Sequence, residues 1–404
     1  MTGIRILHIH DPNHNHSADS SRESNAGRVH VACTQALYLT IQMTRLETEV
    51  ACQIQQSIRS LGGDGFVAEC NNGTIDRSDV LLLGELRTFH RLIEQMRKPP
   101  LECVRLSEQL NEQVSRVSRP VSFEIDCGPH VLRLSERTHV MGVLNVTPDS
   151  FSDAGQYYET DRAVERAYEM AEEGADIIDI GGESTRPGSD SISTEEELAR
   201  VIPVIQRLHG RINVPISIDT TKSIVAREAI KAGAHIVNDI SALRYDPGMA
   251  GVVAEHGIPL ILMHMKGLPK NMQKNPTYTD LIGEIYEFLD ERVETAVEAG
   301  IARDRIIVDP GIGFGKKWPD NFILLSRLKQ FHGLGCPLLI GVSRKSFIGW
   351  ALNRPEDDRV MGTAAAVAAS ILKGAHIVRV HDVKEMVQVV QIVDRIRNTV
   401  PSGL

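Results

Sequence analysis

Several features that would place this chain in other protein classes are missing from its sequence. No long basic run occurs, and the net charge of the 404 residues is −9. The basic face that binds a nucleic-acid backbone is therefore not expected. No apolar run approaches the roughly 18 residues that cross a bilayer, and the N-terminus has no charged-then-apolar secretory signal. These absences predict a protein that binds neither nucleic acid nor membrane.

The cysteines also exclude two kinds of small scaffold. All six are scattered along the chain, and no Cys-x-x-Cys pair occurs. This spacing argues against a structural zinc site and against a disulfide framework, so a cytoplasmic location is expected. Apolar residues make up 42% and charged residues 24% of the sequence, as in ordinary globular proteins. The length allows two domains.

Residues 1–120 predict a small α/β or α+β domain of unknown role. Ile4 to His8 has the pattern of a strand, and residues 9–30 are expected to be poorly ordered. This stretch is rich in histidine, but the histidines have no fixed spacing and no acidic cluster nearby, which favours a solvated loop over a metal site. A long helix is predicted from about Val31 to Leu61, ended by a pair of glycines. Two short strands and two helices follow: Phe66–Glu69, Val80–Leu83, Leu86–Met96 and Leu106–Val117. No phosphate-binding loop or catalytic constellation occurs here.

The pattern changes at Val121, where a second domain, residues 121–404, is expected to begin. Val121, Phe123 and Ile125 alternate before a Cys-Gly-Pro turn, which predicts a β-hairpin. Apolar runs then alternate with helical segments to the end of the chain. The runs are Val140–Val146, Asp176–Ile180, Pro215–Asp219, Ile236–Asn238, Leu260–Met263, Ile306–Asp309, Leu338–Val342 and Ile377–Val380.

Eight such units predict a closed (β/α)₈ TIM barrel. Strands without polar alternation, each followed by a helix, form parallel sheets that helices cover, and eight units suit the closed barrel. An open doubly wound sheet is the alternative. The turn that follows the first strand begins at Asn145 and reads Asn-Val-Thr-Pro-Asp-Ser, which is not the glycine-rich pattern of a dinucleotide site.

Polar residues follow the strands at their C-terminal ends, the edge at which a (β/α)₈ barrel carries its active site. They are Asn145, Asp179, Glu183, Asp219, Asn238, Asp239, His264, Asp309, Ser343, Arg344, Lys345, Arg379, His381 and Asp382. Helix capping is an alternative for a single member such as Asp239 or Asp382. Capping does not explain asparagine, arginine, lysine and histidine together at eight edges.

The residue types at this edge suit a polar ring and a phosphate. Acceptors for ring N–H groups are Asp219, Asn238 and Asp309. Positive charge for a phosphate comes from Arg379 and His381. Asn145 offers an uncharged oxygen to a Mg²⁺ ion that keeps most of its waters and shares phosphate oxygens. The loops at 147–159 and 181–193 are longer than the roughly 2–6 residues usual in such units, and long loops over a barrel mouth are commonly lids.

Eight segments in order make the chain resemble the dihydropteroate synthase family from about Phe123 to Arg397. They are GVLNVTPDSFSDAG at 142–155, DIGGESTRPGS at 179–189, SIDTTK at 217–222, VNDIS at 237–241, LMHMKGLPKNMQ at 262–273, DPGIGFGK at 309–316, GVSRKSFIG at 341–349 and RVHDV at 379–383. Ala154 replaces a glycine of the family's first loop. Residues 1–120 resemble an extra domain found in some members.

The resemblance implies the residues of a site. Those for the pterin substrate are Asp219, Asn238, Met263, Asp309 and Lys345. Those for the diphosphate are Asn145, Arg379 and His381, with Asn145 also contacting Mg²⁺. Those for 4-aminobenzoate are Thr185, Arg186, Pro187, Phe314, Lys345 and Ser346. Asp153 would organise the metal and diphosphate, and the catalytic set would be Asp153, Asp219, Asp309 and Lys345.

The same resemblance implies the reaction. (7,8-Dihydropterin-6-yl)methyl diphosphate and 4-aminobenzoate would give 7,8-dihydropteroate and diphosphate, in folate biosynthesis, by a Mg²⁺-assisted substitution that begins with loss of diphosphate. A homodimer and a sulfonamide target are implied as well. Two alternatives stay open: a corrinoid-linked methyltransferase, which needs neither the STRPG nor the SRKS segment, and a non-catalytic pterin-binding protein, expected to have a damaged phosphate or amine site.

Overall fold

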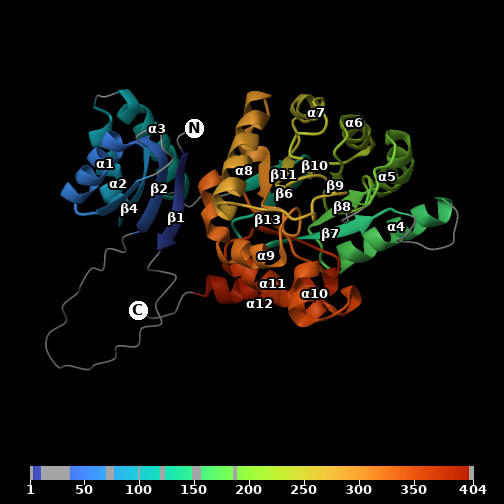
Figure 1. Cartoon of the computed structure of the whole chain (residues 1–404). Helices are drawn as coiled ribbons and strands as arrows, with labels where there is room; N and C mark the ends of the chain where they lie inside the picture. Colours follow the sequence, from blue (N-terminus) through green and yellow to red (C-terminus); the bar gives the residue numbers. More distant parts are fainter. Residues whose placement is uncertain are drawn as a thin grey trace, which may run out of the picture. The chain divides into compact units, whose positions relative to one another are not determined.

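The computed structural model describes residues 3–10, 37–69, 77–98, 101–118, 123–147, 156–184 and 189–399. The chain divides into two compact units, unit 1 (Met1–Val121) and unit 2 (Ser122–Leu404). Figure 1 shows the elements of both in chain order. Buried apolar side chains form separate cores in the two units. No described helix is both long enough and apolar enough to cross a membrane.

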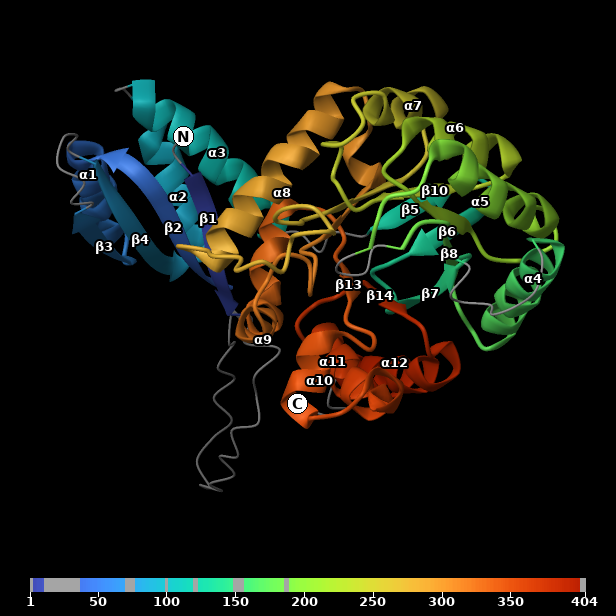
Figure 2. The ribbon, with the colours of Figure 1, turned by 45° about the vertical axis from the view of Figure 1, so that its right-hand side comes forward.

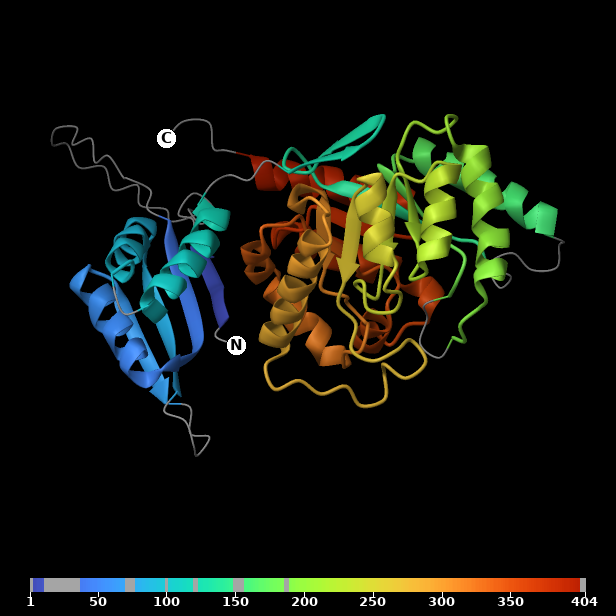
Figure 3. The ribbon, with the colours of Figure 1, turned by 90° about the horizontal axis from the view of Figure 1, so that it is seen from above.

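Unit 1 is a four-stranded antiparallel sheet with helices packed on one side (Figure 3). The strand order is β1-β2-β4-β3. The elements are β1 (Gly3–His10), β2 (Tyr38–Glu47), α1 (Thr48–Ser60), β3 (Asp64–Glu69), β4 (Arg77–Glu85), α2 (Leu86–Met96) and α3 (Leu101–Ser118). One face of each central strand is buried with the apolar sides of the helices, as expected for an amphipathic sheet.

The long helix predicted from Val31 to Leu61 is wrong over much of its length. Residues 38–47 form the strand β2, and α1 begins only at Thr48, while residues 31–36 lie outside the described part of the chain. Leu39, Ile41 and Met43 are buried and their neighbours are more exposed. This period of two is the pattern of a half-buried strand. β1 also runs on to His10, into the stretch expected to be poorly ordered, whose remainder is outside the described residues.

Unit 2 begins with the predicted hairpin and continues as the predicted barrel. The hairpin strands are β5 (Glu124–Cys127) and β6 (His130–Arg133). The barrel strands are β7 (His139–Asn145), β8 (Ile177–Gly181), β9 (Ile216–Asp219), β10 (Ile236–Asp239), β11 (Leu260–Met263), β12 (Ile306–Asp309), β13 (Leu339–Gly341) and β14 (Ile377–Val380). They are parallel, in the order β12-β11-β10-β9-β8-β7-β14-β13. A parallel bridge between Val308 and Leu338 joins the two outer strands, so the eight strands close into a barrel.

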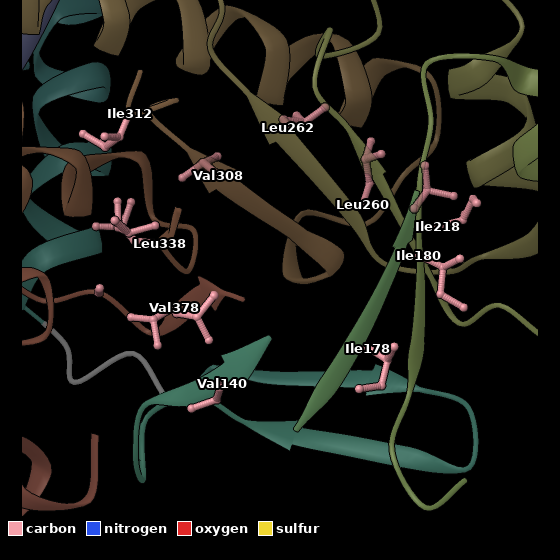
Figure 4. Packing of buried hydrophobic residues seen from close by; sticks show 14 of the residues in the cluster. Val140, Ile178, Ile180, Ile218, Leu260, Leu262, Val308, Ile312, Leu338 and Val378 are labelled. Carbon is pink, nitrogen blue, oxygen red and sulfur yellow. The ribbon is translucent and has the colours of Figure 1, made fainter. Parts of the chain in front are cut away.

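The helices of unit 2 surround this barrel (Figure 2). They are α4 (Gln156–Glu172), α5 (Thr194–Leu208), α6 (Ser223–Ala232), α7 (Met249–His256), α8 (Leu281–Glu298), α9 (Trp318–Ser326), α10 (Ser346–Leu352), α11 (Val360–Leu372) and α12 (Val383–Asn398). Their buried sides pack on outward-facing strand residues, including Val140, Ile178, Ile218 and Leu260 (Figure 4). This shell is the main core of unit 2.

A second core fills the end of the barrel at which the strands begin. Ile125 and Leu132 of the hairpin pack against the first inward-facing residues of the strands, among them Ile177, Ile236 and Ile307. Figure 3 shows the hairpin at this end, with the strands running away from it. The hairpin therefore seals one end, and the polar C-terminal ends of the strands lie at the other.

Candidate active site

The inward-facing side chains of the barrel strands change from apolar to polar or charged between one inward-facing position and the next. Side chains of a strand alternate between its faces. The residue two positions after each inward-facing residue of the second core therefore also points inward. Ile177 is followed in this way by Asp179, and the same step leads from Ile236 to Asn238, from Ile307 to Asp309 and from Ile377 to Arg379. The second core therefore lies directly below a layer of polar side chains, which forms the base of the candidate site.

Arg379 is held between two carboxylates. Its Nε lies 2.6 Å from Asp179 Oδ2, and its Nη2 lies 2.7 Å from Asp219 Oδ2. Asn238 Nδ2 donates a hydrogen bond of 3.1 Å to the same Asp179 oxygen. The fold therefore brings Asp219, Asn238 and Arg379 together as the sequence predicted.

Asp179 is a member of this cluster to which the sequence assigned no role. Its side chain is fully buried, and its Oδ1 and the Oγ of Ser217 have no hydrogen-bond partner among the described atoms. The two residues are neighbours in register on β8 and β9. A carboxylate in the middle of an apolar strand was the available signal, because burying an acidic group is costly unless it is paired.

A second group lies after β12 and β13. Asp309 Oδ1 accepts a hydrogen bond of 2.7 Å from Gly311 N. Lys345 Nζ donates to the carbonyl oxygen of Ile312 and lies 4.6 Å from the centre of the Phe314 ring. Lys345 precedes α10, whose first residue, Ser346, is exposed. The structure therefore places Asp309, Phe314, Lys345 and Ser346 in one region.

Burial sets the protonation of these groups. It raises the pKa of Asp219 to about 7, although Arg379 opposes the shift. It also raises the pKa of Asp309, against the opposing field of Lys345. Burial lowers the pKa of Lys345 to about 8 despite the nearby Asp309 carboxylate. For Arg379, burial opposes the charged form, but Asp179 and Asp219 outweigh it and raise the pKa.

An apolar wall accompanies the charged groups. Met263 ends β11, is buried, and forms a cluster with Ile240, Met265 and Met272, with Phe314 packed against it. A flat ring that presents polar edges and apolar faces suits a site with such a wall beside buried carboxylates.

Asn145 and His381 lie at the ends of two further strands. Asn145 is half-buried at the end of β7, and its register partner on β8 is Gly181. His381 follows β14, and its Nδ1 lies 3.0 Å from Ser343 Oγ, which also accepts a hydrogen bond of 3.2 Å from His381 N. Ser343 therefore orients His381, a role that only the folded arrangement reveals.

Four polar residues at the strand ends, Asp239, His264, Arg344 and Asp382, have partners of another kind. Asp239 accepts hydrogen bonds from Ser241 N and Leu243 N, so it caps a turn. Asp382 pairs with Arg344. Local backbone and ion-pair partners thus use the carboxylates of Asp239 and Asp382, the two residues for which capping was an open alternative. His264 Nδ1 lies 2.9 Å from Nζ of Lys316, a residue of the loop after β12.

Four predicted site residues lie outside the described residues. They are Asp153, Thr185, Arg186 and Pro187. Within the described ranges, no group of three or more His, Cys, Asp or Glu side chains is arranged to hold a metal. A Mg²⁺ ion that takes most of its ligands from water and phosphate needs only one or two protein oxygens. The Asn145 amide fits that requirement.

Comparison with known proteins matches this architecture. A family model described as pterin binding enzyme matches residues 141–381. The dihydropteroate synthase of Bacillus subtilis is 50% identical over 270 residues, which cover 67% of this chain and 92% of that protein. The structure of the Yersinia pestis dihydropteroate synthase with a sulfonamide drug complex has a TM-score of 0.65 at 46% identity, covering 68% of this chain and 100% of that one. The Xanthomonas albilineans enzyme in complex with 7,8-dihydropteroate has a TM-score of 0.63 at 42% identity, with coverages of 69% and 100%.

Another relative also matches unit 1. A probable bifunctional folylpolyglutamate synthase/dihydropteroate synthase of Haloferax volcanii is 38% identical over 383 residues, covering 93% of this chain and 44% of that protein. Because unit 2 begins only at Ser122, this alignment includes most of unit 1. The match to the family model and the close relatives of barrel length lead to one conclusion: the chain belongs to the dihydropteroate synthase family of pterin-binding enzymes.

Proposed function

We propose that unit 2 joins (7,8-dihydropterin-6-yl)methyl diphosphate to 4-aminobenzoate through the residues at its barrel mouth. Dihydropteroate synthases are transferases of folate biosynthesis. One observation supports the residue assignment above all, a buried set of alternating charges. Asp179 and Asp219 flank Arg379. Asp309 interacts electrostatically with Lys345, whose pKa burial lowers.

The pterin sub-site consists of Asp219, Asn238, Met263, Asp309 and Lys345. Carboxylates accept the ring's N–H donors, and the amide of Asn238 can serve a donor or an acceptor. Asn238 Nδ2 donates one of its two hydrogens to Asp179, which leaves the amide oxygen and the second N–H for the ring. Met263 supplies an apolar contact for the ring face.

The diphosphate sub-site consists of Asn145, Arg379 and His381. Arg379 carries a permanent charge. Ser343 orients His381, which lies two residues after Arg379 in the chain. Asn145, with Asp153, would hold Mg²⁺. When bound, this ion supplies charge neutralisation to the phosphate oxygens.

The amine sub-site consists of Phe314, Lys345 and Ser346, with Thr185, Arg186 and Pro187 of the second loop. The Lys345 ammonium and the exposed start of α10 suit a carboxylate, while Phe314 suits an aromatic ring. Each of these contacts orients the amine toward the pterin.

We expect the reaction to use this arrangement in two steps. The bond between the exocyclic CH₂ and the diphosphate oxygen breaks first, and the cation that forms is stabilised by the carboxylates of Asp219 and Asp309. Arg379 and His381 hold the departing diphosphate. The amine nitrogen, held in line by its sub-site, then bonds to the CH₂ group and loses a proton. No protein nucleophile is needed.

The proposal extends to a homodimer in the cytoplasm. Exposed aromatic side chains gather on α9 and α10, where the rings of Trp318 and Trp350 lie 5.5 Å apart and Phe322 is also exposed. A patch of this kind can pack against the same patch of a second copy of the chain, in an isologous interface. Light scattering of the wild type and of Trp350→Glu tests the dimer, because the variant should be a monomer.

The proposed cytoplasmic location agrees with the cysteines. The described cysteines are free thiols, as is usual in a reducing compartment.

One assay tests the reaction. The purified chain is incubated with the pterin diphosphate and Mg²⁺, with and without 4-aminobenzoate, and diphosphate release is followed. Release only with the amine, together with formation of dihydropteroate, is expected. Methyl transfer to a corrinoid instead, or pterin binding without turnover, would support one of the two alternative functions.

A further inference from the structure

A completely buried lysine lies beside the site but is not among the residues proposed to contact substrate. The side chain of Lys316 is 1% exposed. Its Nζ lies 2.9 Å from His264 Nδ1, and it donates hydrogen bonds of 2.8 Å to Gly311 O and 3.0 Å to Phe314 O. Burial lowers the pKa of Lys316 well below its usual range. Three acceptors around Nζ favour the ammonium form, because each of its three N–H groups then has a partner.

His264, the residue directly after the neighbouring strand β11, completes this arrangement. Its ring packs edge-on against Phe288, with centroids 4.9 Å apart. Burial and the charge of Lys316 lower the pKa of His264 well below its usual range. A neutral imidazole whose Nδ1 accepts from Lys316 carries its own hydrogen on Nε2. The pair thus links the end of β11 to the loop after β12.

That loop is tightly confined. Gly311 and Gly315 have φ values of 69° and 63°, in the left-handed region that favours glycine. A Cβ at Gly311 would lie 1.9 Å from His264 O, and one at Gly315 would lie 2.3 Å from Lys266 O. The backbone of the loop therefore lies directly against the segment that follows β11.

The same loop carries the partners of Lys345. Ile312 O accepts a hydrogen bond from Lys345 Nζ, and the Phe314 ring lies 4.6 Å from that nitrogen. Gly311 N donates to Asp309 Oδ1. The two carbonyls that Lys316 binds, those of Gly311 and Phe314, lie on either side of Ile312. Lys316 therefore holds both ends of the short turn that positions Lys345.

We propose that Lys316, supported by His264, is a positioning residue for the amine sub-site, which it builds by fixing the turn 311–314 and hence Phe314 and Lys345. This inference rests on the proposed roles of Phe314 and Lys345. Most of the proposed pterin and diphosphate contacts, among them Asp219, Asn238 and Arg379, come from other strands. Lys345 serves both sub-sites, but the amine sub-site would lose the positions of Phe314 and Lys345 together, so the loss of Lys316 affects the amine more than the pterin.

The test compares Lys316→Met with the neighbouring Lys317→Met in the full chain. Met fills a similar volume without donors, and Lys317 is exposed. For Lys316→Met, the KM for 4-aminobenzoate should rise about tenfold and kcat should fall about tenfold. The Kd for the pterin diphosphate, measured by calorimetry without the amine, should change by about two-fold or less. Lys317→Met should match the wild type in all three quantities.

Two variants of His264 keep the test decisive if Lys316→Met does not fold. His264→Leu removes the acceptor and should reproduce the rise in the amine KM. His264→Gln retains an acceptor and should have an amine KM close to that of the wild type. An unchanged amine KM in folded Lys316→Met or His264→Leu would overturn the proposal. Equal increases in the pterin Kd and the amine KM would also overturn it, because they indicate general disruption. Failure of the wild type itself to form dihydropteroate would count against the proposed function instead.

Discussion

Asp179 Oδ2 lies 2.6 Å from Arg379 Nε and also accepts the hydrogen bond from Asn238 Nδ2. One buried oxygen atom thus orients a residue proposed for the diphosphate and a residue proposed for the pterin ring. Asp179 itself lies in the middle of β8. It is a positioning residue whose effect reaches two sub-sites at once.

Replacing Asp179 by asparagine should therefore impair both sub-sites. The variant removes the charge that orients Arg379 and allows the Asn238 amide to turn. A displacement of this kind costs about 100-fold in rate, so kcat/KM for the pterin diphosphate should fall by about that factor. Steady-state assays of diphosphate release measure it. Ser217→Ala, in the adjacent register position, is the control and should leave kcat/KM unchanged; equal values for both variants would contradict the role of Asp179.

The pH dependence of the reaction should have two limbs. Burial raises the pKa of Asp219 to about 7 and lowers that of Lys345 to about 8. Below the first value, Asp219 becomes protonated and loses the charge that accepts ring N–H groups and stabilises the cation. Above the second, Lys345 loses its charge. We expect kcat/KM to be greatest between the two and to fall on both sides, as measured from about pH 5.5 to about pH 9.5.

Two variants assign the limbs. Asp219→Asn should have low activity without the acidic limb, because the amide does not titrate. Lys345→Arg should retain the acidic limb and lose the alkaline one, since arginine stays charged throughout this range. Wild-type limbs in both variants would assign the titrations to other groups.

The barrel of unit 2 could be predicted because its strands are short and apolar with helices between them. The hairpin strands β5 and β6 were predicted from alternation and a Cys-Gly-Pro turn. The strand β2 was missed because Tyr38–Glu47 runs directly into α1, with no glycine or proline to separate the two. The apolar residues of β2 and α1 therefore form one continuous series, to which both a helical and a strand period can be fitted. Only the face that is buried in the folded protein distinguishes the strand from the helix.

The residues that belong to the site could be predicted more readily than the contacts that they make with one another. Residues such as Asp219 and Asp309 end strands, and the closed barrel brings strand ends together. Which polar end points inward depends on local partners, as Asp239 demonstrates by capping its own turn. The partners of Lys316, on two loops and at 1% exposure, depend on close packing that a linear pattern does not encode.

Two histidines at the starts of strands should make unit 2 sensitive to acid. His235 Nδ1 accepts a hydrogen bond from Ile216 N, and His376 Nδ1 accepts one from Leu338 N. Burial lowers the pKa of His235 to about 4 and that of His376 to about 3. Since these values lie below the roughly 6.5 of an unfolded chain, the stabilisation is complete above about pH 6.5 and is lost as the pH falls toward them.

Urea denaturation at several pH values measures this effect. The free energy of unfolding should decrease from about pH 6.5 to about pH 4 in the wild type. His235→Asn should have a shallower decrease, because the group that must take up a proton is gone. His90→Asn, at an exposed position in unit 1, is the control. A wild-type slope in His235→Asn would exclude this histidine as a source of acid sensitivity.

Lys222 should be important for stability because it neutralises a buried acid. Its Nζ lies 2.5 Å from Glu197 Oε2 and also pairs with Glu183, and the side chain of Glu197 is 1% exposed. Removing one partner of a buried pair costs about 3–5 kcal/mol, so Lys222→Met should lower the free energy of unfolding by about that amount in urea denaturation.

A second substitution separates charge from packing at this position. Adding Glu197→Gln to Lys222→Met removes the unpaired charge and should recover part of the loss. Arg227→Gln breaks an exposed pair with Glu255 and should cost less than about 1 kcal/mol. Equal losses in Lys222→Met and Arg227→Gln would mean that Glu197 is not stabilised by its pairing.

Unit 2 alone should retain the catalytic activity of the whole chain. All proposed site residues belong to it, and among the described residues its cores contain none from unit 1. The bacterial relatives that it matches have about the length of the barrel alone. A chain beginning at Ser122 should therefore keep kcat and both KM values within about two-fold, since units with separate cores fold independently. Circular dichroism checks that the shortened protein is folded. A folded but inactive unit 2 would assign unit 1 a part in turnover, because the barrel would then contain every proposed contact to substrate and still fail to react.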